Sequence, residues 1–336
     1  MKGRRARILA EVVDRYIHTR RPVSSQEIVR VYRHRLSPAT IRNELHALEE
    51  EGYLYKPHVS AGRVPTVQGF RFFAQWLLAV AELDAKAERL PAEPHPLPGL
   101  PPLAELLRRT ALLLSALTGQ LGFVIPPKGE ALPCRGVVLR AVEPGKALAA
   151  TFSAFGVLEA RLVSVPADLS PEEEREAEAW LAARLRAPAP TPPPEPWQGR
   201  AVHTAYRLLQ ELTADVPALP LFAEGWPRLL TELGAHSPEW ALARVRDLLR
   251  LMEDERGFAA LIGELRAGRE GVLAHVGEDL VPELRELTLV TAPYFPGQGV
   301  LGVAGPLWLD YARTFSAVRY LASRLQSLLL QCGGAP

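Results

Sequence analysis

The chain has 336 residues, enough for two or three domains, and its formal net charge of +1 points to no particular partner. Its two cysteines, Cys134 and Cys332, exclude a disulfide framework and a cysteine-rich zinc site, and we expect both to be free thiols. No apolar run approaches the length of a membrane span and no apolar signal core follows the charged N-terminus, so we expect a soluble cytoplasmic protein without a membrane partner.

The charge is unevenly distributed along the chain. Residues 1–75 contain 14 Lys and Arg against 7 Asp and Glu, whereas the remainder contains 25 basic and 31 acidic residues. A basic head on an acidic body is typical of a nucleic-acid-binding module joined to a part that does not touch nucleic acid. Chance clustering is the alternative interpretation. Scarce Asn, Met and Cys with abundant Arg and Pro indicate a thermophile or a GC-rich genome.

The first predicted elements are three helices in close succession. Apolar residues at helical spacing predict one helix over 4–19 and a second over 25–32, the latter capped by Ser24. The third helix begins with Ser37 as its cap and Pro38 at its first position, where the missing N–H costs nothing. Three short helices in this order are typical of a helix-turn-helix domain.

The third helix has one apolar face and one polar face. Ile41, Leu45 and Leu48 share the face that contacts the other helices. Arg can bond guanine and Asn can bond adenine through two hydrogen bonds, so we predict that the opposite face reads DNA. The predicted recognition residues are Ser37, Ala39, Thr40, Arg42, Asn43 and His46, and Asn43 is the only asparagine of the chain. Taken alone, the pattern also fits an ordinary capped helix with a solvated face.

A basic hairpin follows this helix directly. Gly52 ends the helix, Tyr53–Lys56 can form a strand, and Val64–Thr66 returns. The tip between these strands has no acidic residue, as a wing that touches phosphate or a minor groove requires. The predicted wing and phosphate contacts are Arg4, Arg5, Lys56, His58, Ser60, Gly62, Arg63 and Arg71. The aromatic residues of the next helix are interpreted as core.

The rest of the chain alternates between strand-like and helical segments. Residues 81–102 are rich in proline and are predicted to form a semi-stiff linker. The expected elements are a helix from 103, strands at 121–125, 136–142, 147–152 and 157–165, helices within 171–264, strands within 270–305 and a last helix at about 309–330. This order indicates an α+β domain that carries an inserted piece.

Two assignments within this body are open. The three strands between 136 and 165 could belong to the main sheet or to the insert, and we favour the insert. The last helix could cover its own sheet or pair with another subunit, and we favour its own sheet.

The body shows no recognisable catalytic motif. The G-x-G-x-x-G pattern at 297–302 precedes a strand rather than a helix, so a glycine-rich hairpin is the better interpretation. His236 and His275 have no further ligands at metal spacing. We therefore expect no cofactor, no metal and no enzyme activity, against the rival hypothesis of an enzyme with a DNA-binding appendage.

Several segments occur in an order that marks a known family. SPATIRNEL at 37–45 and PHVSAGRVPT at 57–66 lie in the head, and LTLVTAPY at 287–294 and DYARTFSAV at 310–318 lie near the other end. With these segments the chain resembles the heat-inducible transcription repressors of the HrcA family. The middle, at about 128–265, matches only in general character.

The resemblance implies a multidomain α+β protein and a function. Its domains would be a winged helix-turn-helix DNA-binding domain over 1–80, a discontinuous GAF-like α/β domain over 103–127 and 250–336, and an inserted α/β dimerisation domain over 128–249. It implies a homodimeric repressor of chaperone operons that binds an inverted-repeat operator of the CIRCE type in double-stranded DNA. It further implies release on heat stress and modulation by the GroEL chaperonin. The alternative is a metabolite-sensing winged-helix repressor with a ligand in its GAF-like domain.

Overall fold

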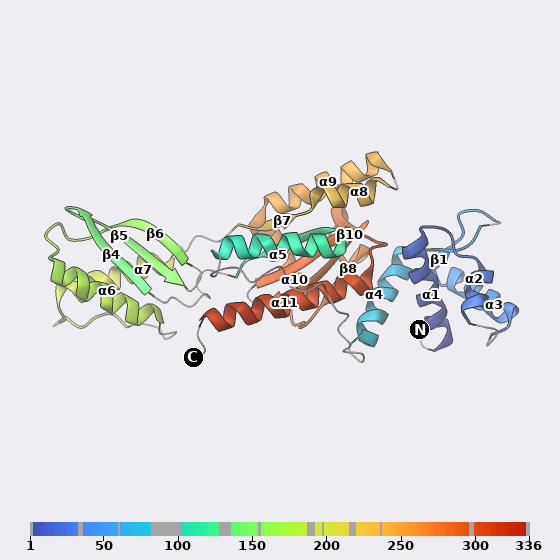
Figure 1. Cartoon of the computed structure of the whole chain (residues 1–336), viewed down its shortest axis with the longest axis horizontal. Coiled ribbons are helices and arrows are strands. Elements are labelled where there is room, and N and C mark those ends of the chain that lie inside the picture. Colours follow the sequence, from blue (N-terminus) through green and yellow to red (C-terminus); the bar gives the residue numbers. More distant parts are fainter. Residues whose placement is uncertain are drawn as a thin grey trace.

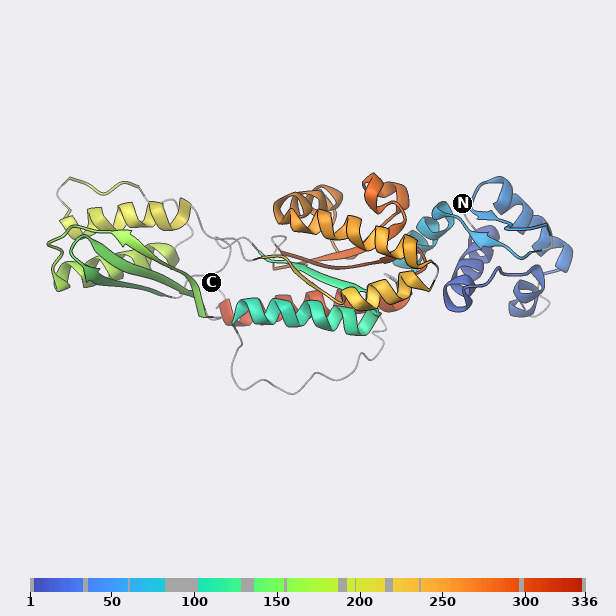
Figure 2. The ribbon, with the colours of Figure 1, turned by 90° about the horizontal axis from the view of Figure 1, so that it is seen from above.

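The protein consists of three parts that follow one another along the molecule (Figures 1 and 2). The computed structural model describes residues 3–32, 36–59, 61–81, 102–127, 136–153, 156–186, 192–196, 198–214, 220–235, 237–295 and 299–333. We call the parts the N-terminal domain (3–81), the central domain, which contains a five-stranded sheet, and the distal domain, which contains a three-stranded sheet. The mixture of helices and sheets confirms the predicted multidomain α+β class.

The N-terminal domain contains the three predicted helices and a short hairpin. Its elements are α1 (Arg4–Thr19), α2 (Ser25–Val31), α3 (Pro38–Glu50), β1 (Leu54–Tyr55), β2 (Val64–Pro65) and α4 (Val67–Ala81). The predicted bounds of α1 are confirmed. The cap of α2 is a complete capping box, because Ser24 accepts from the Glu27 N–H while the Glu27 carboxylate accepts from the Ser24 N–H at 2.7 Å.

The central domain is an antiparallel sheet between two layers of helices. Its elements are α5 (Leu103–Thr118), β3 (Leu121–Ile125), β7 (Phe222–Glu224), α8 (Trp226–Gly234), α9 (Pro238–Glu253), α10 (Glu255–Arg266), β8 (Leu273–Val276), the 3-10 turns η2 (Gly277–Asp279) and η3 (Pro282–Leu284), β9 (Leu287–Tyr294), β10 (Gly299–Pro306) and α11 (Tyr311–Gly333). The strand order is β7-β3-β10-β9-β8. α5 and α11 cover one face and α8, α9 and α10 the other.

Two predictions about the central domain are confirmed. α11 packs on β9, β10 and α5, so it covers the sheet of its own chain. β10 begins at Gly299 and runs antiparallel to β9, so a strand rather than a helix follows the G-x-G-x-x-G pattern. Residues 297 and 298, the first two of that pattern, lie outside the described residues.

The distal domain has a core of its own. It contains β4 (Gly136–Glu143), β5 (Lys146–Ser153), β6 (Gly156–Ser164), α6 (Pro171–Arg186) and α7 (Arg200–Ala214). The strands form an antiparallel sheet in the order β4-β5-β6, and α6 and α7 cover one of its faces. The three strands thus belong to the insert rather than to the central sheet.

The predicted end of the insert at residue 249 requires correction. β7 pairs with β3, with Gly122 opposite Glu224. Leu229 of α8 and Leu248 of α9 share a buried core with Phe123 of the central sheet. Residues from 222 onward therefore belong to the central domain, and the last element of the distal domain is α7. The sequence did not reveal this because β7 has only three residues.

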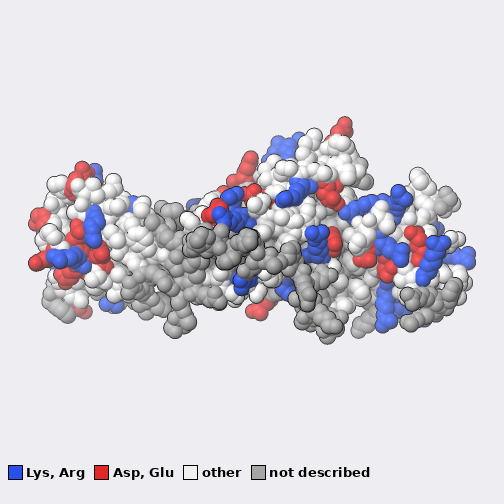
Figure 3. Space-filling view, viewed as in Figure 1, with Lys and Arg blue, Asp and Glu red and all other residues white. Residues whose placement is uncertain are grey.

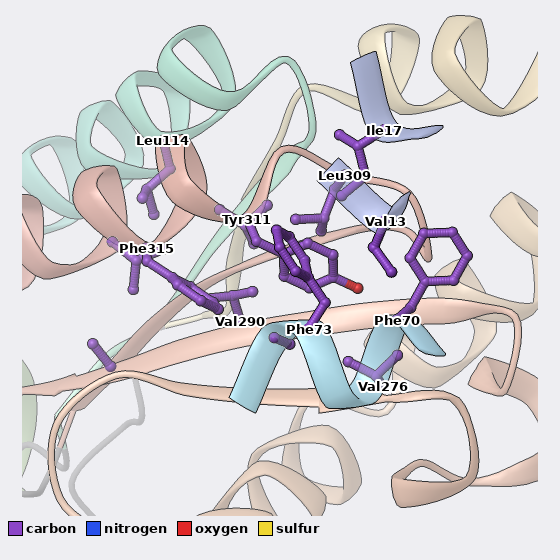
Figure 4. Close-up of a cluster of buried hydrophobic side chains, with 14 of the residues drawn as sticks. Val13, Ile17, Phe70, Phe73, Leu114, Val276, Val290, Leu309, Tyr311 and Phe315 are labelled. Atoms are coloured by element: carbon purple, nitrogen blue, oxygen red, sulfur yellow. The ribbon is translucent and has the colours of Figure 1, made fainter. Parts of the chain in front are cut away.

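The N-terminal and central domains share one hydrophobic core. Val13 and Ile17 of α1 and Phe70 and Phe73 of α4 lie beside Tyr311 of the central domain (Figure 4). The Phe73 and Tyr311 rings meet edge to face with centroids 5.8 Å apart. The two domains therefore form one packed unit at this joint. Residues 82–101, most of the predicted linker, lie outside the described residues.

Candidate nucleic-acid interface

The polar face of α3 lies on the surface of the N-terminal domain. Ile41, Leu45 and Leu48 are completely buried and fix the helix against the rest of the domain. Burial of one face leaves the other in solvent, where it can enter a groove. The exposed side chains on this face are Ala39, Arg42, Asn43 and His46.

The polar side chains of this face differ in the hydrogen bonds and ion pairs that they form within the protein. The Arg42 Nε donates weakly to the Pro38 carbonyl at 3.4 Å, and the His46 Nδ1 lies 3.8 Å from the Glu50 carboxylate. The Asn43 amide has no hydrogen-bond partner among the described residues. Asn43 is therefore free to bond a base edge without first breaking a contact within the protein.

Two hydroxyl side chains cap the first turn of α3. The Ser37 Oγ accepts from the Thr40 N–H at 3.0 Å and lies 2.9 Å from the Thr40 Oγ1. This cap replaces one of the hydrogen bonds that a helix lacks at its start. The N-terminal end of α3, where the helix dipole is positive, thus lies at the surface that would face phosphate.

The hairpin after α3 is fixed at both of its ends. Gly52 has a φ of +79°, a left-handed conformation that lets the chain leave α3, and the Tyr53 N–H donates to the Leu48 carbonyl at 2.9 Å. The returning strand pairs with Val23, which precedes α2, through two backbone hydrogen bonds with Arg63. A Cβ on Gly62 would lie 2.6 Å from the Val23 backbone, so glycine is required for this close approach.

The tip of the hairpin extends into solvent. The side chains of Lys56 and His58 are exposed, and Val59 is 98% exposed. Ser60, a predicted contact, lies outside the described residues. The structure thus brings Lys56 and His58 into the same hairpin, directly after the polar helix α3.

Arg63, a predicted wing contact, forms an ion pair within the N-terminal domain. Its side chain is only 12% exposed, and its Nε donates to the Glu49 Oε1 at 2.6 Å. The Lys56 Nζ lies 3.6 Å from the other oxygen of the same carboxylate. Glu49 therefore connects α3 to the residues that follow β1 and precede β2 in the hairpin, a role that we did not predict.

Arg5 also forms ion pairs within the N-terminal domain. Its Nε donates to Glu44 at 2.8 Å, and a second ion pair joins it to Glu51, so it fixes α1 to α3. The hydrogen bond with Glu44 raises the pKa of the Arg5 guanidinium. Arg4, by contrast, is exposed and forms no ion pair with another described residue. Of the two, Arg4 is the better candidate for phosphate.

Arg71 lies at the joint with the central domain rather than in the hairpin. Its Nη2 donates to the Val276 carbonyl at 3.2 Å, and its Nε lies 3.2 Å from the Asp279 carboxylate. The side chain is only 25% exposed. This arrangement makes Arg71 a connection between the two domains, a role that we did not predict for it.

Exposed basic side chains are frequent over the N-terminal domain, at the end of the molecule opposite the distal domain (Figure 3). Arg21 and Arg30 add exposed positive charge that the sequence analysis did not single out. Within the described ranges, no group of three His, Cys, Asp or Glu side chains could hold a metal ion. None of the helices in those ranges is long and apolar enough to cross a membrane.

The chain is similar to a family of regulators over nearly its whole length. The family model described as the HrcA protein C-terminal domain matches residues 104–315. A heat-inducible transcription repressor HrcA from Nocardioides sp. is 32% identical, with 97% of this chain and 98% of the relative covered. The HrcA of Syntrophobacter fumaroxidans is 31% identical, with 97% of both chains covered.

One solved structure has the same fold. A crystal structure of a hypothetical protein superimposes with a TM-score of 0.66 at 24% identity, with 99% of both chains covered.

Proposed function

The chain belongs to the HrcA family of heat-inducible transcription repressors, and from this premise we propose that it represses transcription by binding an inverted-repeat operator as a homodimer. The operator is of the CIRCE type and lies before chaperone genes. The N-terminal domain is a winged helix-turn-helix, with α3 as the recognition helix and residues 54–65 as the wing.

One observation carries the DNA-binding part of this proposal. α3 exposes Arg42, Asn43 and His46 on one face, and the hairpin directly after it in the chain exposes Lys56 and His58. Arg and Asn supply paired hydrogen bonds to base edges, whereas Lys56 and Arg4 supply charge for phosphate. The small side chain of Ala39 lets the start of the helix lie deep in a groove.

The distal sheet supports the dimer. α6 and α7 cover only one of its faces, and the other face carries Leu148 and Leu162, which lie opposite each other on β5 and β6. These side chains are 38% and 61% exposed. A sheet face with neighbouring exposed leucines suits a second copy of itself, and a two-fold dimer matches an inverted repeat.

The proposal is tested by footprinting on the promoter of the chaperone operon from the same genome. We expect protection of two half-sites in inverted orientation, with centres separated by whole turns of the double helix. Fluorescence anisotropy with the protected duplex, at several salt concentrations, should give an affinity that falls as salt rises. Binding that is equally strong on the operator and on random DNA of the same length would contradict a specific repressor.

Release on heat stress and support by the GroEL chaperonin are the parts that rest on the family alone. The test is operator binding by purified protein that has been warmed and cooled, with and without GroEL. We expect GroEL to increase the fraction that binds the operator. An unchanged fraction would remove the chaperonin from the proposal while leaving the DNA-binding part intact.

A further inference from the structure

A second candidate site lies in the central domain, far from the wing. A cavity of about 1030 Å³ opens where the end of α10 and the loop after it face α11 and the end of β9. β8 pairs with β9 only as far as Thr291, so Ala292 and Pro293 line the cavity without a neighbouring strand on that side. Its size is at the upper end of the range for small-molecule sites.

The wall of this cavity contains a buried positive charge. Arg266 is 7% exposed, and its guanidinium donates to the Thr291 carbonyl at 2.9 Å, to the Thr291 Oγ1 at 2.8 Å and to the Gly271 carbonyl at 2.8 Å. All three acceptors are neutral. In the described part of the chain Arg266 has no carboxylate partner, and its burial lowers the pKa of the guanidinium. A buried ion without a counter-ion is costly, so an anion in the adjoining space would stabilise it.

Two further arginines line the same cavity. Arg269 comes from the loop after α10 and Arg319 from α11. Both side chains are exposed, and neither forms an ion pair with another described residue. Glu270 is the only acidic residue on the described lining, so positive charge exceeds negative charge by two. Arginines from α10, from the loop after it and from α11 thus line one space.

We propose that this cavity binds a small polyanion, with Arg266, Arg269 and Arg319 as its ligands. Planar guanidinium groups bond carboxylate and phosphate oxygens in pairs, and both chemistries fit the charge of the site. The cavity also touches Leu78 of α4, the helix that connects the N-terminal domain to the rest of the protein. A bound anion would therefore contact the same helix that carries Phe70 and Phe73 in the shared core.

Isothermal titration of the full chain with citrate and with pyrophosphate tests this site. The buffer should be free of phosphate and low in salt, because salt screens exposed charge. We expect one molecule to bind per chain, and the preferred probe distinguishes a carboxylate ligand from a phosphate ligand. Arg319→Gln and Arg269→Gln should each weaken binding about tenfold, as expected for a lost charge-assisted hydrogen bond.

Arg313→Gln is the matched control. Arg313 is an exposed arginine of the same helix α11 but does not line the cavity, so its removal should leave the affinity unchanged. Because both cavity variants change exposed side chains, their unfolding temperatures should stay near that of the wild type. The proposal is overturned if neither probe binds. It is also overturned if both cavity variants bind like the wild type, because the anion would then lie elsewhere, such as on the basic N-terminal domain.

Discussion

At the scale of single residues, the proposed reading face of α3 exposes Arg42, Asn43 and His46. The Asn43 amide is exposed and has no partner among the described residues, so it can make two hydrogen bonds to an adenine. We predict that Asn43→Ala lowers operator affinity by roughly 1–3 kcal/mol with little effect on random DNA, measured by anisotropy. Lys56→Ala should instead weaken binding to both DNAs. Equal losses on both DNAs for Asn43→Ala would contradict a base-reading role.

Glu49 is a second residue with a predicted effect, although it would not itself touch DNA. Its carboxylate holds Arg63 and Lys56, and so fixes the wing relative to α3. Glu49→Gln should reduce the ratio of operator affinity to random-DNA affinity about tenfold, because the wing loses its orientation. Affinity for random DNA should not fall, since the change removes a negative charge from the surface near DNA.

The control for this prediction is the next residue along the helix. Glu50→Gln makes the same change in charge, but Glu50 is exposed and its nearest described ionic partner is His46 at 3.8 Å. It should retain the wild-type ratio. If Glu49→Gln and Glu50→Gln change the ratio alike, only net charge matters and Glu49 does not position the wing.

The sequence predicted which face of α3 is exposed better than it predicted which basic side chains nearby are already paired. The face follows from a helical period within thirteen residues, so Arg42, Asn43 and His46 could be assigned together. Arg71 could not be assigned, because its partners Val276 and Asp279 are about two hundred positions away. Charge patterns show which residues are basic, whereas only the fold shows which of them are already paired.

Among the elements, the wing depends on a backbone contact that tolerates no side chain. A Cβ at Gly62 would meet the Val23 carbonyl carbon and oxygen at 2.6 Å, and backbone atoms cannot move aside as a flexible side chain can. We predict that Gly62→Ala destabilises the protein by about 1–3 kcal/mol, measured by urea denaturation, and weakens operator binding by displacing the wing. Gly136→Ala is the control, since a Cβ there meets nothing within 4 Å. Unchanged stability of Gly62→Ala would show that the strand after the wing can shift freely.

Element bounds were predictable where the chain gives a strong local signal. α1 has apolar residues at helical spacing and β3 is a short apolar run, and their predicted bounds, 4–19 and 121–125, agree with the structure. β7 has three half-buried residues and no alternation long enough to identify it. Its pairing with β3 is a long-range contact, and for that reason the end of the insert was placed too late.

At the scale of the whole molecule, the orientation of the N-terminal domain is fixed by a second contact besides the shared core. The Arg20 guanidinium donates to the Trp308 carbonyl and to Glu232, and lies 5.6 Å from the Trp308 ring centroid. Trp308 in turn stacks on Trp240 of α9, with centroids 5.9 Å apart. In a dimer this joint would set the distance between the two recognition helices.

A weaker contact between Arg20 and Trp308 should let the protein bind operators whose half-sites are spaced differently. We predict that Trp308→Ala still binds the operator but discriminates less against one lengthened by about five base pairs, which turns one half-site by about half a turn. The ratio of the two affinities, measured by anisotropy, should be about tenfold smaller than for the wild type. A ratio equal to that of the wild type would show that the joint does not set the spacing.

In the proposed dimer, the uncovered face of the distal sheet is the interface between the two copies. Leu162 is 61% exposed and lies opposite Leu148, so a charge placed there would be buried against apolar surface in the partner. Leu162→Glu should therefore convert the dimer to monomers in analytical ultracentrifugation and weaken operator binding at least a hundredfold. Its unfolding temperature should change little, because the side chain is exposed within one chain.

Leu242→Glu makes the same change at a residue of α9 that is 60% exposed, and should leave the dimer intact. If Leu242→Glu gives monomers and Leu162→Glu stays dimeric, the dimer interface lies in the central domain. The central domain would then determine how the two N-terminal domains are placed on DNA.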